Sequence, residues 1–477
     1  MRAPTSPRSP RRQGTRITTG LTAAGVLLAV AACGGDDSSG GDEGNGEPAS
    51  PITMWTPHVT PERLAGQEAV AAAFTEETGI EVEVVPLAGA DQNQSLVTGA
   101  ASGDVPDVIL HAPDQTAAWN EQGLLDTEVP AQVMENLGAE TFSEQALDLV
   151  TVGGALAAVP SDGWGHLVVY RQDLLDDAGL DTPETVQDLA EIAAELSSGS
   201  MSGMALGTQP GNPFTTESLE AILQPTGCDL ITDGEVTVDS PECAEGLRVF
   251  RELADSSAGG QFDVESARAA YLAGNAAMLL FSSHIIDELA GLDPNNPLTC
   301  AECADDPMFL AENSGFVTVL NAAETGGRQY GATLNYGVPV GANADEARQY
   351  IEYVLGDGYV DTLATATEGR VPLRGGTAEN PTEFIDAWGE LPFGPDPEND
   401  ASISEIYGEE VVQALQDGAN AISRWGFGTD DATVAGAVFS QHVLAQNIEP
   451  LYRGTDPAEV AAQLAAEVST VQQEIGG

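Results

Sequence analysis

The chain has 477 residues and a formal net charge of −59, from 75 acidic and 16 basic residues. Such a charge repels nucleic-acid phosphates and anionic membrane surfaces, so we expect neither as a partner. Every basic residue is arginine. The lack of lysine excludes P-loop ATPases, protein kinases, pyridoxal-phosphate enzymes and Schiff-base aldolases, which all need a lysine ammonium.

Residues 1–32 have the pattern of a secretory signal peptide. Five arginines precede the apolar run "ITTGLTAAGVLLAVAA", which is too short and too rich in small residues for a permanent membrane span. The following "VAAC" resembles the lipobox of bacterial lipoproteins, in which the cysteine receives a diacylglycerol. This resemblance implies lipidation at Cys33, and ordinary cleavage after an Ala-x-Ala site is the alternative. Residues 33–50, rich in glycine, serine and acids, are predicted to be a tether.

Strand and helix patterns alternate along the next part of the chain. "ITMW" predicts a short buried strand, and a helix follows it, with Thr60 as its cap, Pro61 at its first position and Gly79 at its end. "IEVEVV" alternates apolar and acidic residues as a half-exposed strand does. A helix at 94–103, a strand at "DVIL" and a helix at 116–125 continue the pattern. This order predicts a parallel sheet with helices on both faces.

Further elements are predicted toward the carboxyl end. "GALAAVP" and "HLVVY" are apolar stretches, and a helix over 186–197 begins with Thr185 and Asp188 spaced as in a capping box. Four more helical patterns lie at 245–257, 345–355, 409–422 and 458–475.

Four cysteines remain beside Cys33, namely Cys228, Cys243, Cys300 and Cys303. An even number in an exported chain indicates two disulfides, and of the three possible pairings we favour the nearest partners, Cys228–Cys243 and Cys300–Cys303. "CAEC" could also be a redox or metal pair, but no second CxxC or histidine pair stands near it. We therefore expect structural disulfides and no metal.

Four blocks, in one order, resemble the extracellular solute-binding proteins of the maltose-binding type. The blocks are "ASGDVPDVIL", the stretch from "GGALAAVPSDGWGHLVVYRQDLL" to "VQDLAEIA", "AYLAGNAAMLL" and "EGRVPLR". The resemblance implies an α/β fold of two hinge-connected lobes, each with a mostly parallel sheet flanked by helices. Lobe one would comprise residues 51–160 and 284–375, and lobe two residues 161–283 and 376–477. Three crossings would join the lobes, near 160–164, 281–284 and 371–376.

Ligands of open α/β sheets bind beyond the carboxyl ends of strands, and those ends carry candidate binding residues. Aromatic rings stack on sugar faces, and polar groups pair with sugar hydroxyls. For Trp55 the alternative is packing against the first helix. Asp114 aligns with a sugar-binding aspartate of the maltose-binding type, and its alternative is the cap of a helix that begins at Gln115. The candidates at these ends are Trp55, His111, Asp114, Asp162 and Trp164.

Five further residues are candidates from the resemblance. Phe281 and Ser282 stand where relatives place a cleft loop. Arg374 matches a late Pro-x-Arg, and its alternative is to hold the crossing together by pairing with an acid. Trp388 and Trp425 could each supply a ring from lobe two, whereas Trp119 lies in mid-helix and is predicted to be core.

The resemblance implies a carbohydrate-binding lipoprotein of an ABC importer, anchored on the outer face of the cytoplasmic membrane. It would capture a mono- or oligosaccharide by lobe closure and deliver it to the permease subunits, which work with a cytoplasmic ATPase. We expect a monomer without cofactor or enzymatic activity, and GxSxG and HExxH motifs are absent. The alternatives are a non-sugar solute such as a polyamine on the same scaffold, or a secreted glycoside hydrolase.

Overall fold

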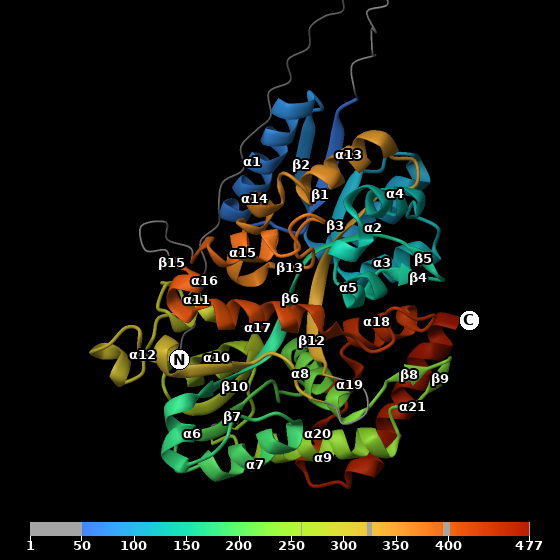
Figure 1. The fold of residues 1–477 in the computed structure, drawn as a ribbon. Coiled ribbons are helices and arrows are strands. Elements are labelled where there is room, and N and C mark those ends of the chain that lie inside the picture. Colours follow the sequence, from blue (N-terminus) through green and yellow to red (C-terminus); the bar gives the residue numbers. More distant parts are fainter. Residues whose placement is uncertain (1–49, 259, 322–326, 395–400, 477) are drawn as a thin grey trace, which may run out of the picture. The chain divides into compact units, whose positions relative to one another are not determined.

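The computed structural model describes residues 50–258, 260–321, 327–394 and 401–476 (Figure 1). The predicted signal peptide, Cys33 and nearly all of the tether lie outside these residues. No helix within the described ranges is both long and apolar enough to cross a membrane.

A mixed sheet of ten strands forms the frame of the molecule. Its order is β2-β1-β3-β12-β6-β10-β7, with β11 and β13 paired to β6 and β16 paired to β12. The strands are β1 (Ile52–Thr56), β2 (Val82–Pro86), β3 (Val108–His111), β6 (Val159–Arg171), β7 (Ser202–Ala205), β10 (Ala276–Ser282), β11 (Ser314–Val317), β12 (Gln329–Gly337), β13 (Val371–Pro372) and β16 (Ile422–Ser423).

The strand directions confirm the parallel prediction at the ends of the sheet. Strand β1 pairs in parallel with β2 and β3, and β10 pairs in parallel with β7. In the middle, β12 runs antiparallel to both β3 and β6, and β6 runs antiparallel to β10. The antiparallel centre was not predicted, because β12 lies outside the alternating strand–helix pattern of the amino-terminal part.

Strands β6 and β12 connect the two ends of the sheet (Figure 1). The first part of β6, Val159–Gly165, pairs with β12, and the following residues His166–Tyr170 pair with β10. We use lobe one for the end that carries β1–β3 and lobe two for the end that carries β7 and β10. The predicted crossing at residues 160–164 falls within β6, while the lobe boundaries along the chain stay predictions.

Helices cover the sheet, and the predicted ones are confirmed to within a few residues. They are α1 (Pro61–Thr78), α2 (Gly89–Ser102), α3 (Pro113–Glu121), α4 (Glu128–Leu137), α5 (Glu144–Leu149), α6 (Gln172–Ala178), α7 (Val186–Leu196), α8 (Pro213–Leu223), α9 (Pro241–Asp255), α10 (Val264–Leu272), α11 (Ile285–Leu289), α12 (Phe309–Asn313), α13 (Ala344–Val354), α14 (Tyr359–Leu363), α15 (Glu383–Gly389), α16 (Ile403–Tyr407), α17 (Glu409–Asn420), α18 (Ala432–Ser440), α19 (Val443–Gln446), α20 (Glu449–Tyr452) and α21 (Pro457–Gly476).

Helix ends follow the sequence signals. Gly79 ends α1 with a φ of 79°, a left-handed conformation that glycine adopts without strain. Thr185 accepts a hydrogen bond from the backbone N–H of Asp188 and Asp188 bonds back, so the predicted capping box opens α7. Short two-stranded hairpins lie between the helices: β4 (Thr151–Val152) with β5 (Ala155–Leu156), β8 (Ile231–Thr232) with β9 (Glu235–Val236), and β14 (Pro392–Phe393) with β15 (Ala401–Ser402).

A buried ion pair lies where β6 passes between the lobes. The Asp162 carboxylate accepts from Nε and Nη2 of Arg370 at 2.9 and 2.6 Å, and neither side chain is more than 1% exposed. The pairing of β6 with β12 shifts register beside Asp162, and the bulged Ser161 accepts from the backbone N–H of Leu373 and from the Tyr359 hydroxyl. Asp162 was expected in the solute cleft. Instead, its carboxylate accepts hydrogen bonds from Arg370 and Ser161 inside the crossing.

Arg374 also lies at this crossing, but it does not pair with an acid as the alternative for it supposed. Its guanidinium donates to Thr141 Oγ1 and to the carbonyls of Leu137 and Leu355, and it stacks on the rings of Phe142 and Phe384. The buried Arg374 thus ties the end of α4 and the turn after it to the segment that follows β13. Carbonyl groups and rings take the place of the expected acid, and sequence alone does not show them.

Candidate solute-binding site

Helix α3 of lobe one faces α18 of lobe two. The two helices pack together, and Thr433 Oγ1 donates to Glu121 Oε2 across the seam at 2.6 Å. A cavity of about 620 Å³ opens beside them, lined by residues of α2, α3 and α18 that include Asp114 and Gly436. A Cβ placed on Gly436 would lie 3.6 Å from Cβ of Asp114, so the helices approach closely at this point.

Asp114 lies in the first turn of α3, at the carboxyl end of β3, as predicted. The helix begins at Pro113 rather than Gln115, and the Gln115 side chain accepts from the backbone N–H of Ala112, so Asp114 is not the cap. Burial raises the pKa of the Asp114 carboxyl, and the Arg424 guanidinium opposes that rise. The Asp114 carboxyl lies in the lining of the cavity at the seam.

Aromatic rings from β6, β12 and α18 form a continuous cluster next to Asp114. The half-buried Trp164 ring lies 5.6 Å from His166 and 6.3 Å from Tyr330, measured between ring centroids. Tyr330 lies 4.9 Å from His166 and stacks at 6.3 Å on Phe439. Trp164, which we predicted for the site, thus belongs to a cluster of four rings, in which Tyr330 and His166 are buried.

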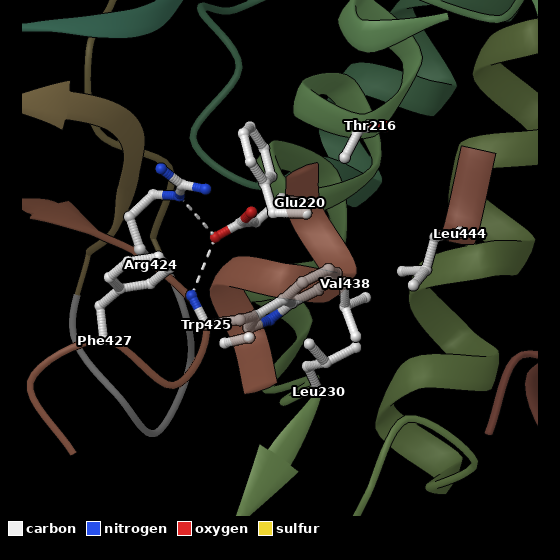
Figure 2. A pocket seen from close by; sticks show the side chains of 10 residues that line it. Thr216, Glu220, Leu230, Arg424, Trp425, Phe427, Val438 and Leu444 are labelled. Atoms are coloured by element: carbon white, nitrogen blue, oxygen red, sulfur yellow. Dashed lines mark hydrogen bonds and ion pairs between the residues drawn. The ribbon is translucent and has the colours of Figure 1, made fainter. Parts of the chain in front are cut away.

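Arg424 follows β16 and lies among these rings. Its guanidinium carbon is 4.2 Å from the centroid of Phe439, 4.8 Å from Tyr330 and 5.0 Å from Phe427. Its Nε donates to Glu220 Oε1 at 3.0 Å (Figure 2). The same oxygen accepts from the backbone N–H of Trp425. Burial alone would lower the pKa of Arg424, but the Glu220 carboxylate raises it above its usual value. Arg424 therefore stays charged.

Charged groups surround the hydroxyl-bearing ring of Tyr330. Asp114, Glu217, Glu220 and Arg424 are all close enough to affect its ionisation, and burial raises the pKa of Tyr330 well above its usual value. Glu217 Oε2 lies 3.2 Å from His166 Nε2. The site thus combines stacking surfaces with carboxylates and a guanidinium, which is the composition that recognises polyhydroxylated solutes.

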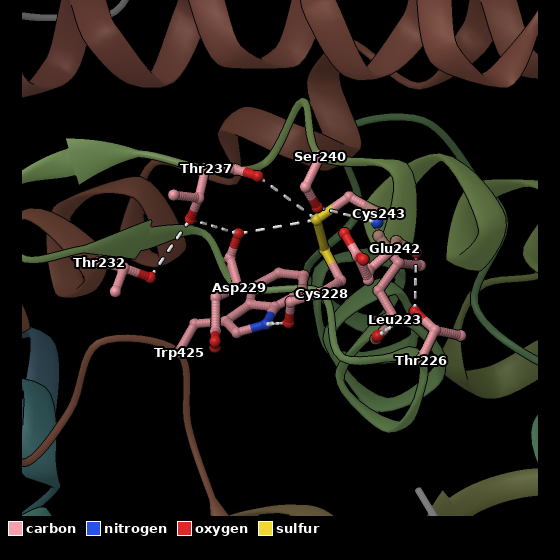
Figure 3. The surroundings of a disulfide bond; sticks show 10 residues. All are labelled: Leu223, Thr226, Cys228, Asp229, Thr232, Thr237, Ser240, Glu242, Cys243 and Trp425. Atoms are coloured by element: carbon pink, nitrogen blue, oxygen red, sulfur yellow. Dashed lines mark hydrogen bonds between the residues drawn. A yellow bond between two sulfur atoms is a disulfide. The ribbon is translucent and has the colours of Figure 1, made fainter. Parts of the chain in front are cut away.

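A disulfide supports the segment that carries Arg424. Both favoured pairings, Cys228–Cys243 and Cys300–Cys303, are confirmed. The indole of Trp425 donates to the carbonyl of Cys228 at 2.7 Å (Figure 3), and the ring is only 5% exposed. Trp425 was predicted to supply a ring to the solute; the structure places it with Arg424 and Phe439 in the lining of a small pocket, where Cys228 holds its indole (Figure 2).

Replacing Cys228 and Cys243 by alanine is expected to lower the free energy of unfolding by about 3 kcal/mol, because the bridge closes a loop of roughly 15 residues. Urea denaturation measures this loss. The matched variant without Cys300 and Cys303, whose loop spans three residues, should lose clearly less. Equal losses in both variants would contradict the loop-length argument.

Of four other predicted residues, Trp388 and His111 lie in the core, whereas Phe281 and Ser282 lie on β10 beside the ring cluster, where Ser282 pairs with His166. Trp388 is fully buried, and its indole donates to the carbonyl of Thr367, so it belongs to the core. His111 is fully buried, and burial lowers its pKa to about 4. Phe281 is 4% exposed and packs edge-on against a phenylalanine of α8 at 5.7 Å. Ser282 is half-buried, with its hydroxyl 3.5 Å from a histidine nitrogen.

Trp55 is half-buried and packs on the small cluster around Trp119 and Leu96, not against α1 as its alternative supposed. Trp119 is fully buried, as predicted. Tyr330, Phe439 and Arg424 were not predicted, because they follow no motif and come together only through the return of β12 and the packing of α18. A weak signal for Arg424 was a rare basic residue directly beside the aromatic stretch "WGF".

The family model for bacterial extracellular solute-binding proteins matches residues 59–361, which is more than half of the chain. The chain therefore belongs to this family. One relative is YcjN of Escherichia coli, which carries the provisional name of an ABC transporter periplasmic-binding protein. It is 26% identical to this chain over 348 residues, which cover 70% of this chain and 76% of YcjN.

Two solved structures share the fold over nearly the whole chain. The GacH receptor of Streptomyces glaucescens has a TM-score of 0.63 and 19% identity, covering 90% of this chain and 100% of that one. The cyclic α-maltosyl-1,6-maltose binding protein of Arthrobacter globiformis has a TM-score of 0.64 and 16% identity, with coverages of 90% and 100%. The predicted two-lobe α/β fold is thereby confirmed, and the chain is an exported solute-binding protein of the ABC transporter type.

Proposed function

We propose that the chain binds a mono- or oligosaccharide at the seam between α3 and α18 and delivers it to the permease of an ABC importer. One observation carries this proposal: Trp164, His166, Tyr330 and Phe439 form one ring cluster, with Arg424 among the rings and carboxylates close by. Sugar faces stack on rings, and their hydroxyls need both donors and acceptors, so this composition fits a carbohydrate.

The names of the relatives support a carbohydrate. The GacH receptor was solved in complex with acarbose, and the Arthrobacter protein is named for a cyclic maltosyl-maltose. We expect no turnover of the solute by this chain. A hydrolase would need two carboxyl groups about 5–10 Å apart on either side of the scissile bond.

The mechanism would be a population shift. Asp114 belongs to lobe one, whereas Arg424 and Phe439 belong to lobe two, so a solute that touches all three stabilises the closed arrangement. The loaded protein would dock on the permease subunits, which a cytoplasmic ATPase drives. A diacylglycerol on Cys33 would supply the two chains that stable anchoring on the outer face of the membrane requires, with residues 33–50 as the tether.

A polyamine is the second candidate solute. Asp114 and Glu217 could pair with its ammonium groups, and the rings of Tyr330 and Trp164 could bind them by cation–π contacts. Arg424, at the centre of the same cluster, opposes a cation. We therefore place the sugar first.

A thermal-shift panel of mono- and oligosaccharides, polyamines, amino acids and phosphate esters tests the proposal on the purified protein. A solute at a hundred times its dissociation constant should stabilise by roughly 2.7 kcal/mol, which moves the midpoint by about a degree or more. We expect one sugar class to produce this shift, without hydrolysis of the sugar. A shift with polyamines alone would exclude the carbohydrate.

A further inference from the structure

Asn93 of α2 lines the cavity of about 620 Å³ at the seam between α3 and α18, and Asp114 of α3 lines the same cavity. The sequence does not single out Asn93, because it lies in the polar stretch "ADQNQS", which carries no motif. The structure shows its side chain exposed and places it in one wall with Asp114. Asn93 is therefore a further candidate for contact with the solute.

A hydrogen bond from Trp119 fixes the orientation of the Asn93 amide. The indole Nε1 of Trp119 donates to Asn93 Oδ1 at 2.9 Å. An indole N–H can only donate, so the amide atom that meets it must be the oxygen. The amide nitrogen, Nδ2, has two N–H groups that this bond does not use. Asn93 thus presents a donor to the cavity that it lines.

Hydrogen bonds between α2 and α3 hold the wall that carries Asn93 and Asp114. Gln115, the residue after Asp114, donates from Nε2 to the carbonyl of Gly89 and to Oε1 of Gln92, each at 3.1 Å. Gln92 is the residue before Asn93. Because the two helix ends are joined in this way, Asn93 and Asp114 are ordered before a solute arrives, which reduces the entropy cost of binding.

The lining of this cavity favours a solute that carries hydroxyl groups. Asn93 Nδ2 donates, whereas the carboxylate oxygens of Asp114 accept. Among the described residues that line the cavity there is no arginine, so an anionic solute would meet Asp114 without a cation to balance it. An ammonium group pairs with Asp114 but cannot accept from Asn93. A hydroxyl both donates and accepts, so a solute with two hydroxyls satisfies both side chains.

We infer that Asn93 is a specificity-determining residue, whose amide donates to one hydroxyl of the solute while Asp114 accepts from another. Asn93 thereby selects a polyhydroxylated solute over a polyamine. This inference rests on the proposed function and discriminates between the two solute classes considered for it. The Trp119 indole, which orients the amide, is a positioning group in this scheme.

Calorimetric titration of the purified full-length chain and of its Asn93→Asp variant tests the inference. The probes are glucose, galactose, xylose, maltose and sucrose, with spermidine as the polyamine. The variant keeps the side-chain shape and an oxygen for the Trp119 indole, but it replaces the Nδ2 donor by an acceptor. We expect the affinity for the bound sugar to fall by about tenfold or more, whereas spermidine should bind no more weakly than it binds the wild type.

Two further variants separate the donor from charge and from folding. Gln94→Glu makes the same amide-to-carboxylate change at the next residue of α2, which does not line the cavity, so it should bind the sugar as the wild type does. Asn93→Leu has no polar side-chain atom and should weaken sugar binding as Asn93→Asp does. Urea denaturation of Asn93→Asp should give the stability of the wild type, because the bond from Trp119 is kept.

The outcomes distinguish the inference from the proposed function. Equal affinity of the wild type and Asn93→Asp for the bound sugar would overturn the inference and leave the proposed function standing. An equal loss in Asn93→Asp and Gln94→Glu would also overturn it, because the added charge alone would then explain the loss. If no sugar of the panel binds the wild-type chain, the proposed function itself fails, and the inference with it.

Discussion

Asp162→Asn is expected to lower the free energy of unfolding by about 3–5 kcal/mol, because it leaves the Arg370 charge buried without its counter-ion. Both side chains are at most 1% exposed, and two hydrogen bonds join them. The pair lies beside the bulge at Ser161, where β6 passes from one lobe to the other. Chemical denaturation followed by circular dichroism measures the loss.

Two comparisons sharpen this prediction. Glu449→Gln breaks the exposed pair with Arg453 and should change stability by only about 0–1 kcal/mol. A double variant that replaces both Asp162 and Arg370 by apolar residues should be more stable than Asp162→Asn, because no unpaired charge then stays buried. A loss in Asp162→Asn no larger than in the surface control would show that the crossing does not depend on the pair.

Trp388→Ala should mainly lower stability, whereas Trp164→Ala should mainly weaken sugar binding. Trp388 is fully buried and hydrogen-bonded, so its loss should lower stability by about 3–5 kcal/mol without weakening the affinity of the folded fraction for sugar. Trp164 is half-buried in the ring cluster, so its loss should weaken sugar binding strongly and lower stability less. Denaturation curves and titrations of both variants measure the two effects. Lost binding in a stable Trp388→Ala protein would contradict this assignment.

The local sequence pattern was enough to predict much of the fold. The alternation of strands and helices predicted the parallel strands β1–β3, and the signals at Gly79 and Thr185 placed helix ends correctly. Pattern could not show that β12 returns antiparallel through the centre of the sheet. That pairing joins residues 329–337 to segments more than 150 residues away, and its strand carries no distinctive sequence signal.

The candidate site was predictable only where it follows a strand end in sequence. Asp114 lies where the rule for open α/β sheets places it, whereas Trp164 lies within strand β6 and not beyond a strand end. Asp162 and Arg374 carry charges that suggested a cleft, but partners distant in sequence hold them inside the crossing. Arg424 could not be found from sequence either, since only the structure shows that it is buried among the rings of Tyr330, Phe427 and Phe439.

A crystal structure of the protein with the sugar that gives the largest thermal shift tests the central claim most directly. We predict one ring of that sugar against Tyr330 and Trp164, between α3 and α18, with hydroxyls bonded to Arg424 and Asp114. A sugar bound elsewhere would contradict the account. The cavity of about 910 Å³ at the β8–β9 hairpin is the clearest such place: Asp431, Arg328 and Arg424 itself line it, but Asp114, Trp164 and Tyr330 do not.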